Sequence, residues 1–189
     1  MSDYKNIFDN TCNNNMIATI GWQLLFGETT YNFGYINSYL EAANDLIDKG
    51  CPDLYVYPII FCYRQYIELS LKNICMSDMN KKDYIDFINK ASHNLNIIWI
   101  EAKKHLNAFE ITAPQNIDFI NKLVNDFNKL DPTSFAFRYP QDKQMNKSLA
   151  NNFSVNNDGT ITQITVNLKN LHDNVELYDL MIRHTYDSI

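Results

Sequence analysis

Residues 51–75, CPDLYVYPIIFCYRQYIELSLKNIC, decide the fold of this chain. Proline is tolerated in the first turn of a helix, where its missing N–H is not needed, so a helix is expected to begin near Pro52 and to run to about Cys75. One apolar stripe recurs along it with helical spacing: Ile60, Tyr63, Ile67, Leu71 and Ile74. Cys62 and Leu69 face the other way, so the helix is apolar on two sides. This pattern is typical of a central helix in a bundle.

Helical periodicity continues on both sides of this stretch. Three long segments repeat apolar residues with the spacing of a helix: 31–50, 117–130 and about 167–186. A fourth begins after Ser92, a residue type that caps helix N-termini, and a short helical piece covers 84–90. We therefore predict a mainly α protein, an up-and-down helical bundle of about five helices.

A different pattern interrupts the helices near residues 153–166. The sequence NDG at 157–159 lies between short apolar segments, and these residue types tolerate the positive φ of a tight hairpin. We expect a small β-hairpin there, inserted into a bundle domain that spans 31–189. Residues 1–30 are expected to form an N-terminal extension with a short docking helix over 16–26.

The composition excludes several classes of function. Lys and Arg number 16 against 22 Asp and Glu, which gives a net charge of −6 at pH 7. That sign is wrong for a protein that coats nucleic acid non-specifically, so any such contact must be local. The four cysteines have no CxxC spacing, so we expect no metal site and no disulfide framework. The motifs GxxxxGK(S/T), GxGxxG, HExxH and GxSxG are missing, and no cofactor is expected.

The distribution of apolar residues also predicts the compartment. The polar first residues lack the basic end and apolar stretch of a signal peptide. The longest apolar runs are far shorter than the roughly 20 residues that cross a bilayer. The sequence therefore predicts a soluble, cytoplasmic protein with no membrane segment.

The first candidate for chemistry is an arginine inside the main apolar stripe. Arg64 has Glu68 one turn later and Lys72 one turn after that. On a surface such i, i+4 pairs contribute only about 0.3–0.5 kcal/mol each. A buried arginine, however, needs a partner, because a lone buried charge costs several kcal/mol. The pattern fits either a structural ion-pair ladder or a charged cluster in the bundle interior or in a cleft between subunits.

Two other segments carry candidate residues. His93 is expected in the first turn of a helix, where the helix dipole disfavours its protonated form and leaves an imidazole that can act as acid or base near pH 7. Arg138 stands among aromatic residues, Tyr139 included, and a guanidinium can stack on rings while it binds a carboxylate or phosphate. The simpler interpretations are a histidine that packs locally and a segment that covers the core. Convergence of Arg64 and Arg138 on a shared acceptor is the functional interpretation.

The order of three segments resembles bacterial proteins of the HEPN type. They are YPIIFCYRQYIELSLK at 57–72, SHNL at 92–95 and DPTSFAFRYP at 131–140, and the resemblance covers about residues 35–187. It implies an up-and-down helical bundle that often dimerises, and roles in RNA cleavage, toxin–antitoxin pairs and phage defence. The partners expected on this basis are a second copy of the chain, RNA or a nucleotide, and an operon-encoded protein.

The sequence also departs from the family pattern. HEPN ribonucleases typically carry an arginine followed, after a gap of a few residues, by a histidine, with the pair on the dimer axis. No histidine lies at that distance after Arg64 or Arg138, so the standard catalytic motif is missing. The motif positions of a divergent branch are matched by Arg64, Glu68, Lys72, His93 and Arg138.

Three hypotheses follow for function. A HEPN-like module that binds a partner, nucleotide or RNA, with no catalysis or with cryptic catalysis, predicts that Arg64 is saturated by Glu68 and main-chain carbonyls, with no open cleft beside it. A metal-independent endoribonuclease, in which His93 serves as acid or base and Arg64 and Arg138 hold a phosphate, predicts a local positive cleft. A purely structural scaffold predicts no pocket. The acidic charge and the missing motif favour the first.

The candidate catalytic residues are His93, Arg64 and Glu68, and the candidate ligand-binding or phosphate-binding residues are Arg138, Tyr139 and Lys72.

Overall fold

The computed structural model describes residues 18–108, 113–149, 154–155, 158, 161–162 and 164–186. In these residues the protein is mainly α, with six α-helices that pack together. The chain divides into two compact units, Met1–Gly34 and Tyr35–Ile189. No helix of the described part is long and apolar enough to span a membrane.

The described part of the first unit centres on a short 3-10 helix, η1 (Trp22–Phe26). Gly21 and Gly27 flank it with φ of 77° and 102°, a left-handed backbone that favours glycine, so the helix ends after five residues. Leu24 and Leu25 are exposed on it. The docking helix expected over 16–26 is thus a short 3-10 helix in its described part, and residues 16 and 17 lie outside the described residues.

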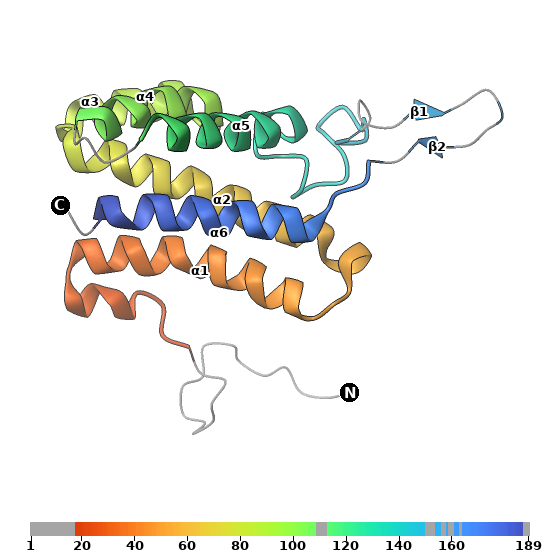
Figure 1. Ribbon diagram of the computed structural model, residues 1–189, viewed down its shortest axis with the longest axis horizontal. Coiled ribbons are helices and arrows are strands. Elements are labelled where there is room, and N and C mark those ends of the chain that lie inside the picture. The colour runs from red at the N-terminus through yellow and green to blue at the C-terminus, as the bar shows by residue number, and fades with distance from the viewer. Residues whose placement is uncertain are drawn as a thin grey trace. The chain divides into compact units, whose positions relative to one another are not determined.

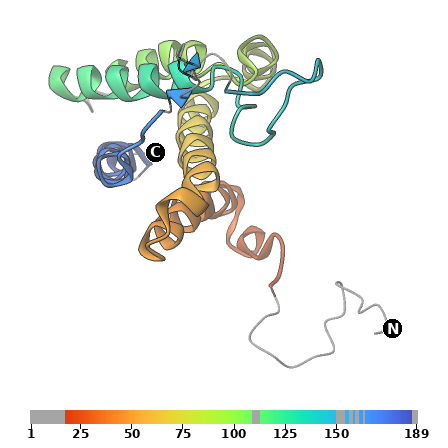
Figure 2. The same cartoon turned by 90° about the vertical axis from the view of Figure 1, so that its right-hand side faces the viewer.

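The second unit is built around one long helix. Its elements are α1 (Glu28–Asp48, whose residues up to Gly34 belong to the first unit), α2 (Pro52–Asp78), α3 (Lys81–Ala91), α4 (Leu95–Ala108), α5 (Pro114–Leu130) and α6 (Leu168–Tyr186). Within this unit α2 lies between α1 on one side and α4 and α5 on the other, and α6 runs alongside it (Figures 1 and 2). The predicted central position of residues 51–75 is therefore confirmed.

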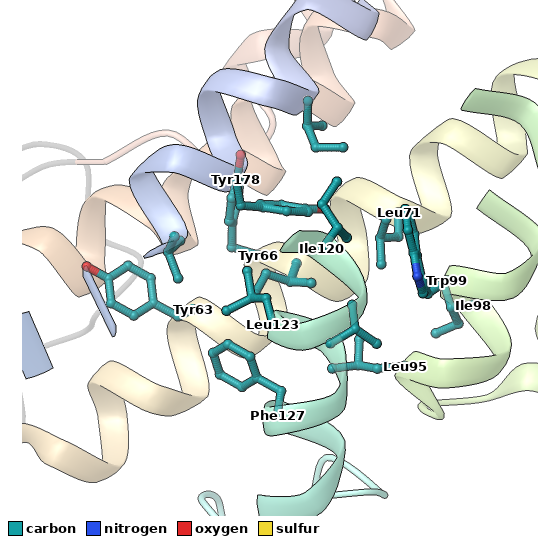
Figure 3. Close-up of a cluster of buried hydrophobic side chains, with 14 of the residues drawn as sticks. Tyr63, Tyr66, Leu71, Leu95, Ile98, Trp99, Ile120, Leu123, Phe127 and Tyr178 are labelled. Carbon is teal, nitrogen blue, oxygen red and sulfur yellow. The ribbon is translucent and has the colours of Figure 1, made fainter. Parts of the chain in front are cut away.

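The hydrophobic core forms where α2 meets its neighbours. All five residues of the predicted stripe of α2 are buried, at 0–3% exposure. They pack with large side chains of the other helices (Figure 3): Leu95, Ile98 and Trp99 of α4, Ile120, Leu123 and Phe127 of α5, and Tyr178 of α6. Each such side chain contributes about 1.5–3 kcal/mol when it leaves water. Packing on both sides of α2 therefore holds the bundle together.

The helix count is six instead of about five, because residues 81–91 form a complete helix. The side chain of Asn80 accepts a hydrogen bond from the Asp83 amide (3.0 Å) and starts α3 earlier than the predicted piece 84–90. At the other end Ser92 has φ 50° and ends α3. Ser92 is therefore not the N-cap of α4. That role belongs to Asn94, whose side chain accepts from the Ile97 amide (3.1 Å).

The hairpin expected near 153–166 falls partly outside the described residues, which exclude Asn157 and Gly159 of its turn. The described part has two short strands, β1 (Ser154–Val155) and β2 (Ile161–Thr162), which pair in antiparallel register. The turn that joins them stays a prediction.

Candidate functional site

Arg64 is the centre of a buried polar cluster on α2. Its side chain is fully buried, and each of its three nitrogens donates to a protein oxygen. Nη1 donates to Glu68 Oε2 at 2.8 Å, Nη2 to the main-chain oxygen of His93 at 2.7 Å, and Nε to that of Asp131 at 3.1 Å. One guanidinium therefore joins α2 to the turn before α4 and to the segment after α5.

Local chain geometry explains why these two carbonyls are available. Helix α5 ends at Leu130 because the residue before a proline, here Asp131, is disfavoured in helical conformation. The last carbonyls of a helix have no partner within the helix, and a buried carbonyl needs a donor. His93 likewise lies in the non-helical turn between α3 and α4. Arg64 supplies the donor in both places.

Glu68 receives three donors and is almost completely buried, at 1% exposure. Its Oε1 accepts from Lys72 Nζ at 2.7 Å and lies 2.8 Å from His93 Nδ1, while Oε2 faces Arg64. Burial by itself would raise the pKa of Glu68. The hydrogen bonds and charges of Lys72 and His93 together outweigh burial, and the net effect lowers that pKa. Glu68 is therefore ionised at neutral pH.

The position of His93 differs from the sequence prediction. It lies before α4 instead of in its first turn, so the orientation of its ring depends on Glu68 and not on a helix N-terminus. Because ionised Glu68 can only accept, Nδ1 of His93 carries the proton of that hydrogen bond. The imidazole is 46% exposed, and its Nε2 has no bonded partner among the described residues. Nε2 of His93 can therefore exchange a proton with a ligand or with water.

The structure brings four of the predicted site residues together and separates two. Arg64, Glu68, Lys72 and His93 form the hydrogen-bonded cluster described above, which we call the Arg64 cluster. The predicted candidates Arg138 and Tyr139 line a different feature, a cavity of about 460 Å³. Arg64 and Arg138 therefore do not converge on a shared acceptor.

The separation has a physical cause in the segment 131–140, which carries both arginine contacts at different points. Arg64 binds the carbonyl of Asp131, while Arg138 Nε donates to the carbonyl of Ser134 at 2.5 Å. Asp131 Oδ1 accepts from the Phe135 amide at 2.8 Å, and Ser134 has φ 60°, so the chain turns between the two contacts. Each arginine thus stabilises its own side of the turn.

Sequence reasoning missed several buried polar residues. Asp131 and Ser134 are both 2% exposed, and the only signal for Asp131 was its position before a proline. On α6, buried Asp179 accepts from Tyr66 Oη at 2.5 Å and pairs with Arg183 Nε at 2.6 Å. The i, i+4 spacing of Asp179 and Arg183 was visible in the sequence and would have found this pair.

Helix α2 also takes part in a second polar network, through Tyr63. Tyr63 Oη donates to Asn44 Oδ1 at 2.7 Å and lies 2.8 Å from His172 Nδ1, and Asn44 Nδ2 donates to Glu176 at 2.9 Å. Burial raises the pKa of Tyr63, so its hydroxyl stays protonated. This network connects α1, α2 and α6 and satisfies their polar groups, and it presents no open nucleophile.

No three His, Cys, Asp or Glu side chains of the described part are grouped so as to hold a metal ion. Comparisons with protein-family models, with curated proteins and with solved structures give no match for this chain. The arguments for function therefore rest on the geometry of the described residues.

Proposed function

We propose that this chain is a HEPN-like helical module that acts by binding a ligand, and not by cutting RNA with an arginine–histidine pair. One observation carries the proposal: Arg64 is fully buried and donates to Glu68 and to two main-chain carbonyls. An arginine that stabilises a phosphate must present its N–H groups to the ligand. In Arg64, each of the three nitrogens already donates a hydrogen bond to an oxygen of the protein.

The surroundings of Arg64 support the same proposal. Four cavities of the described part are lined by residues of the 129–149 region, by Ile164 and Val166, and by positions of α2, α5 and α6, and Arg64, Glu68 and His93 line none of these four. A substrate would therefore meet the Arg64 cluster only at its exposed edge, through His93 and the slightly exposed Lys72. The role that fits Arg64 is to hold two loops in place.

The test is an RNA cleavage assay in EDTA with a mixed, single-stranded substrate. We expect no cleavage by the wild-type protein above that of a His93→Ala variant. A His105→Ala variant is the matched control, since His105 also lies on a carboxylate, Asp78, in another part of the protein. Cleavage by wild-type and His105→Ala proteins that disappears in folded His93→Ala would overturn the binding-only proposal.

That overturning result defines the second candidate function, a metal-independent endoribonuclease. The observation in its favour is the pairing of ionised Glu68 with His93 Nδ1, which orients the imidazole and leaves Nε2 outward. A carboxylate that holds one ring nitrogen prepares the other to accept a proton. In this case Arg64 and Glu68 are positioning residues, and the exposed edge formed by His93 and Lys72 would contact the RNA.

A further inference from the structure

Three cavities of the second unit lie in a row, because neighbouring cavities share lining side chains. The first has a volume of about 460 Å³ and shares three side chains with a second cavity of about 80 Å³: Tyr57, Phe137 and Leu149. The second shares three others with a third cavity, also of about 80 Å³: Ile60, Leu130 and Val166. We call these three cavities the cavity row. It extends from the segment after α5, past α2, to the beginning of α6.

The second cavity is apolar throughout. Apart from the hydroxyl group of Tyr57, its lining side chains are hydrocarbon, and they include Ile164 and Val166 from the segment before α6. A water molecule is well held only where about two to four polar groups can bond it, so this lining suits an apolar group. The volume is also far below the roughly 300 Å³ of a whole small-molecule pocket. The second cavity therefore fits a narrow part of a ligand, such as an unbranched hydrocarbon chain.

Charged side chains of opposite sign lie at the two ends of the cavity row. Arg138 and Lys147 line the first cavity, whereas Asp126 lines the third. Neither cation has a carboxylate partner among the described residues: Arg138 donates through Nε to the carbonyl of Ser134 and forms no ion pair, and Lys147 forms none either. In a chain of net charge −6, the two unpaired cations favour an anionic group at this end. Asp126 disfavours an anionic group at the other end.

The cationic end is organised by contacts within the chain. An antiparallel bridge between Gln141 and Lys147 closes the turn that carries Lys147. The acidic residue of that turn, Asp142, accepts hydrogen bonds within the turn and does not line the first cavity. The Arg138 guanidinium carbon lies 5.5 Å from the centre of the Tyr139 ring, and its terminal nitrogens bond no oxygen of the described residues. Both cations are therefore available to one anionic group.

We propose that the cavity row binds an anion with an unbranched hydrocarbon tail, of which a medium-chain carboxylate is the simplest example. The carboxylate lies between Arg138 and Lys147, since a guanidinium matches two carboxylate oxygens with two N–H groups. The tail follows the aromatic and aliphatic lining of the first cavity and enters the second beside Val166. The inference rests on the proposed function, because it names the ligand of the binding module.

The experiment is calorimetric titration of the full chain with unbranched carboxylates, from butyrate through hexanoate and octanoate to decanoate, each below the concentration at which it forms micelles. A methylene group that moves from water into an apolar cavity contributes about 0.8 kcal/mol. Affinity should therefore rise about fourfold with each added carbon and level off when the cavity row is filled. An affinity that does not rise from butyrate to decanoate would overturn the inference.

Two further probes test the charge of the ligand. Decanol has the same tail without a charge and should bind about tenfold more weakly than decanoate. Decyltrimethylammonium has a tail of the same length and a positive charge. A protein of net charge −6 attracts cations in general, so weaker binding of this cation than of decanoate shows selection by Arg138 and Lys147. Equally tight binding of the two ions would mean non-specific association with alkyl tails and would overturn the inference.

Four variants locate the two parts of the ligand. Arg138→Ala and Lys147→Ala should each weaken decanoate binding by about tenfold, the usual loss for a charged hydrogen bond. Lys143→Ala is the matched control and should change it by less than about twofold, because it removes the same charge from the same turn at a residue that does not line the first cavity. Ile164→Gln places an amide at the second cavity, at a side chain that is 40% exposed. It should weaken decanoate about tenfold and butyrate less than about twofold.

The outcomes for the cavity row and for the proposed function are distinguishable. Circular dichroism confirms first that each variant is folded. Equal decanoate affinity in the wild type and all four variants, or no decanoate binding by the wild type, would overturn the cavity row and leave the binding module intact. RNA cleavage that depends on His93 would overturn the binding-only function, whatever the calorimetry shows.

Discussion

Arg64 and Arg138 are the same residue type in two regions of one domain, and their surroundings are opposite. Arg64 is fully buried and donates to three oxygens of its own chain. Arg138 is exposed, stands beside a tyrosine ring and lines a cavity with a second cation. Under the proposed function, the number of protein acceptors around an arginine, and not its hydrophobic neighbourhood in the sequence, distinguishes a structural arginine from one that is available to a ligand.

The two regions are nonetheless connected through segment 131–140. Arg64 holds its first residue through the Asp131 carbonyl, and Asp131 in turn accepts from the Phe135 amide. Arg138 follows three residues later. The buried arginine therefore supports the loop that presents the exposed one.

The largest expected effect comes from removing Arg64. Arg64→Ala leaves buried Glu68 without one of its partners and two buried carbonyls without donors, so it should lower the free energy of unfolding by about 3–5 kcal/mol. Arg138→Ala removes an exposed side chain and its one hydrogen bond, to the Ser134 carbonyl, and should lower it by only about 1 kcal/mol. Urea unfolding followed by circular dichroism measures both. Similar losses in the two variants would abolish the contrast between the regions.

The next effect concerns pH. Because the folded-state pKa of Glu68 is lowered, the unfolded chain binds its proton more readily, and the stability that Glu68 contributes is lost as pH falls. The loss begins near the ordinary pKa of a glutamate, about 4.3, and continues through the lower folded-state value. Glu68→Gln should lack this part of the acid sensitivity.

Unfolding free energies from pH 7 down to pH 3 test this expectation. Glu101→Gln is the matched control, since Glu101 is a more exposed carboxylate paired with Lys104 on α4. Glu68→Gln is expected to reduce the free energy of unfolding at pH 7 by about 2 kcal/mol. Below about pH 5 its free energy of unfolding should fall less steeply with pH than that of the wild type, whereas the control variant should show the wild-type slope. If the free energy of unfolding of Glu68→Gln fell with pH as steeply as that of the wild type, the pKa of Glu68 would not be lowered by folding.

A small effect is also expected for the third arginine, Arg183, which is half exposed but pairs with a buried carboxylate. Arg183 is 47% exposed and pairs with buried Asp179, which also accepts from Tyr66. Arg183→Ala leaves Asp179 one donor and access to water on the vacated side, so the cost should be about 1 kcal/mol. Thermal unfolding ranks the three variants, and a cost for Arg183→Ala above that for Arg64→Ala would reverse the order.

The central helix and the Arg64–Glu68 pair could be predicted because both depend on spacing within one segment. The apolar stripe of α2 follows from helical periodicity, and the pair follows from its i, i+4 separation. Ser92 misled the prediction because its residue type fits a helix N-cap, while the chain uses it in a left-handed conformation to end α3. Asn94, two residues later, has the same capping chemistry, and the sequence does not rank the two.

The partners of Arg64 and the lining of the cavity could not be predicted. The carbonyls of His93 and Asp131 are main-chain groups, which have no signature in the sequence. Tyr57 and Lys147 are far apart along the chain and line the same cavity only because segment 131–149 folds back over α2. Such contacts depend on tertiary packing, which periodicity does not encode.

The three-way bonding of Arg64 also has a consequence for the order of folding. Its carbonyl partners lie 29 and 67 residues away, so both contacts require large loops to close, whereas Glu68 is one turn away on the same helix. The charge pair can therefore form as soon as α2 does, and the guanidinium is neutralised before it is enclosed. Closure of the two loops on it is then a late event, and Arg64→Ala should speed unfolding far more than it slows refolding in stopped-flow measurements.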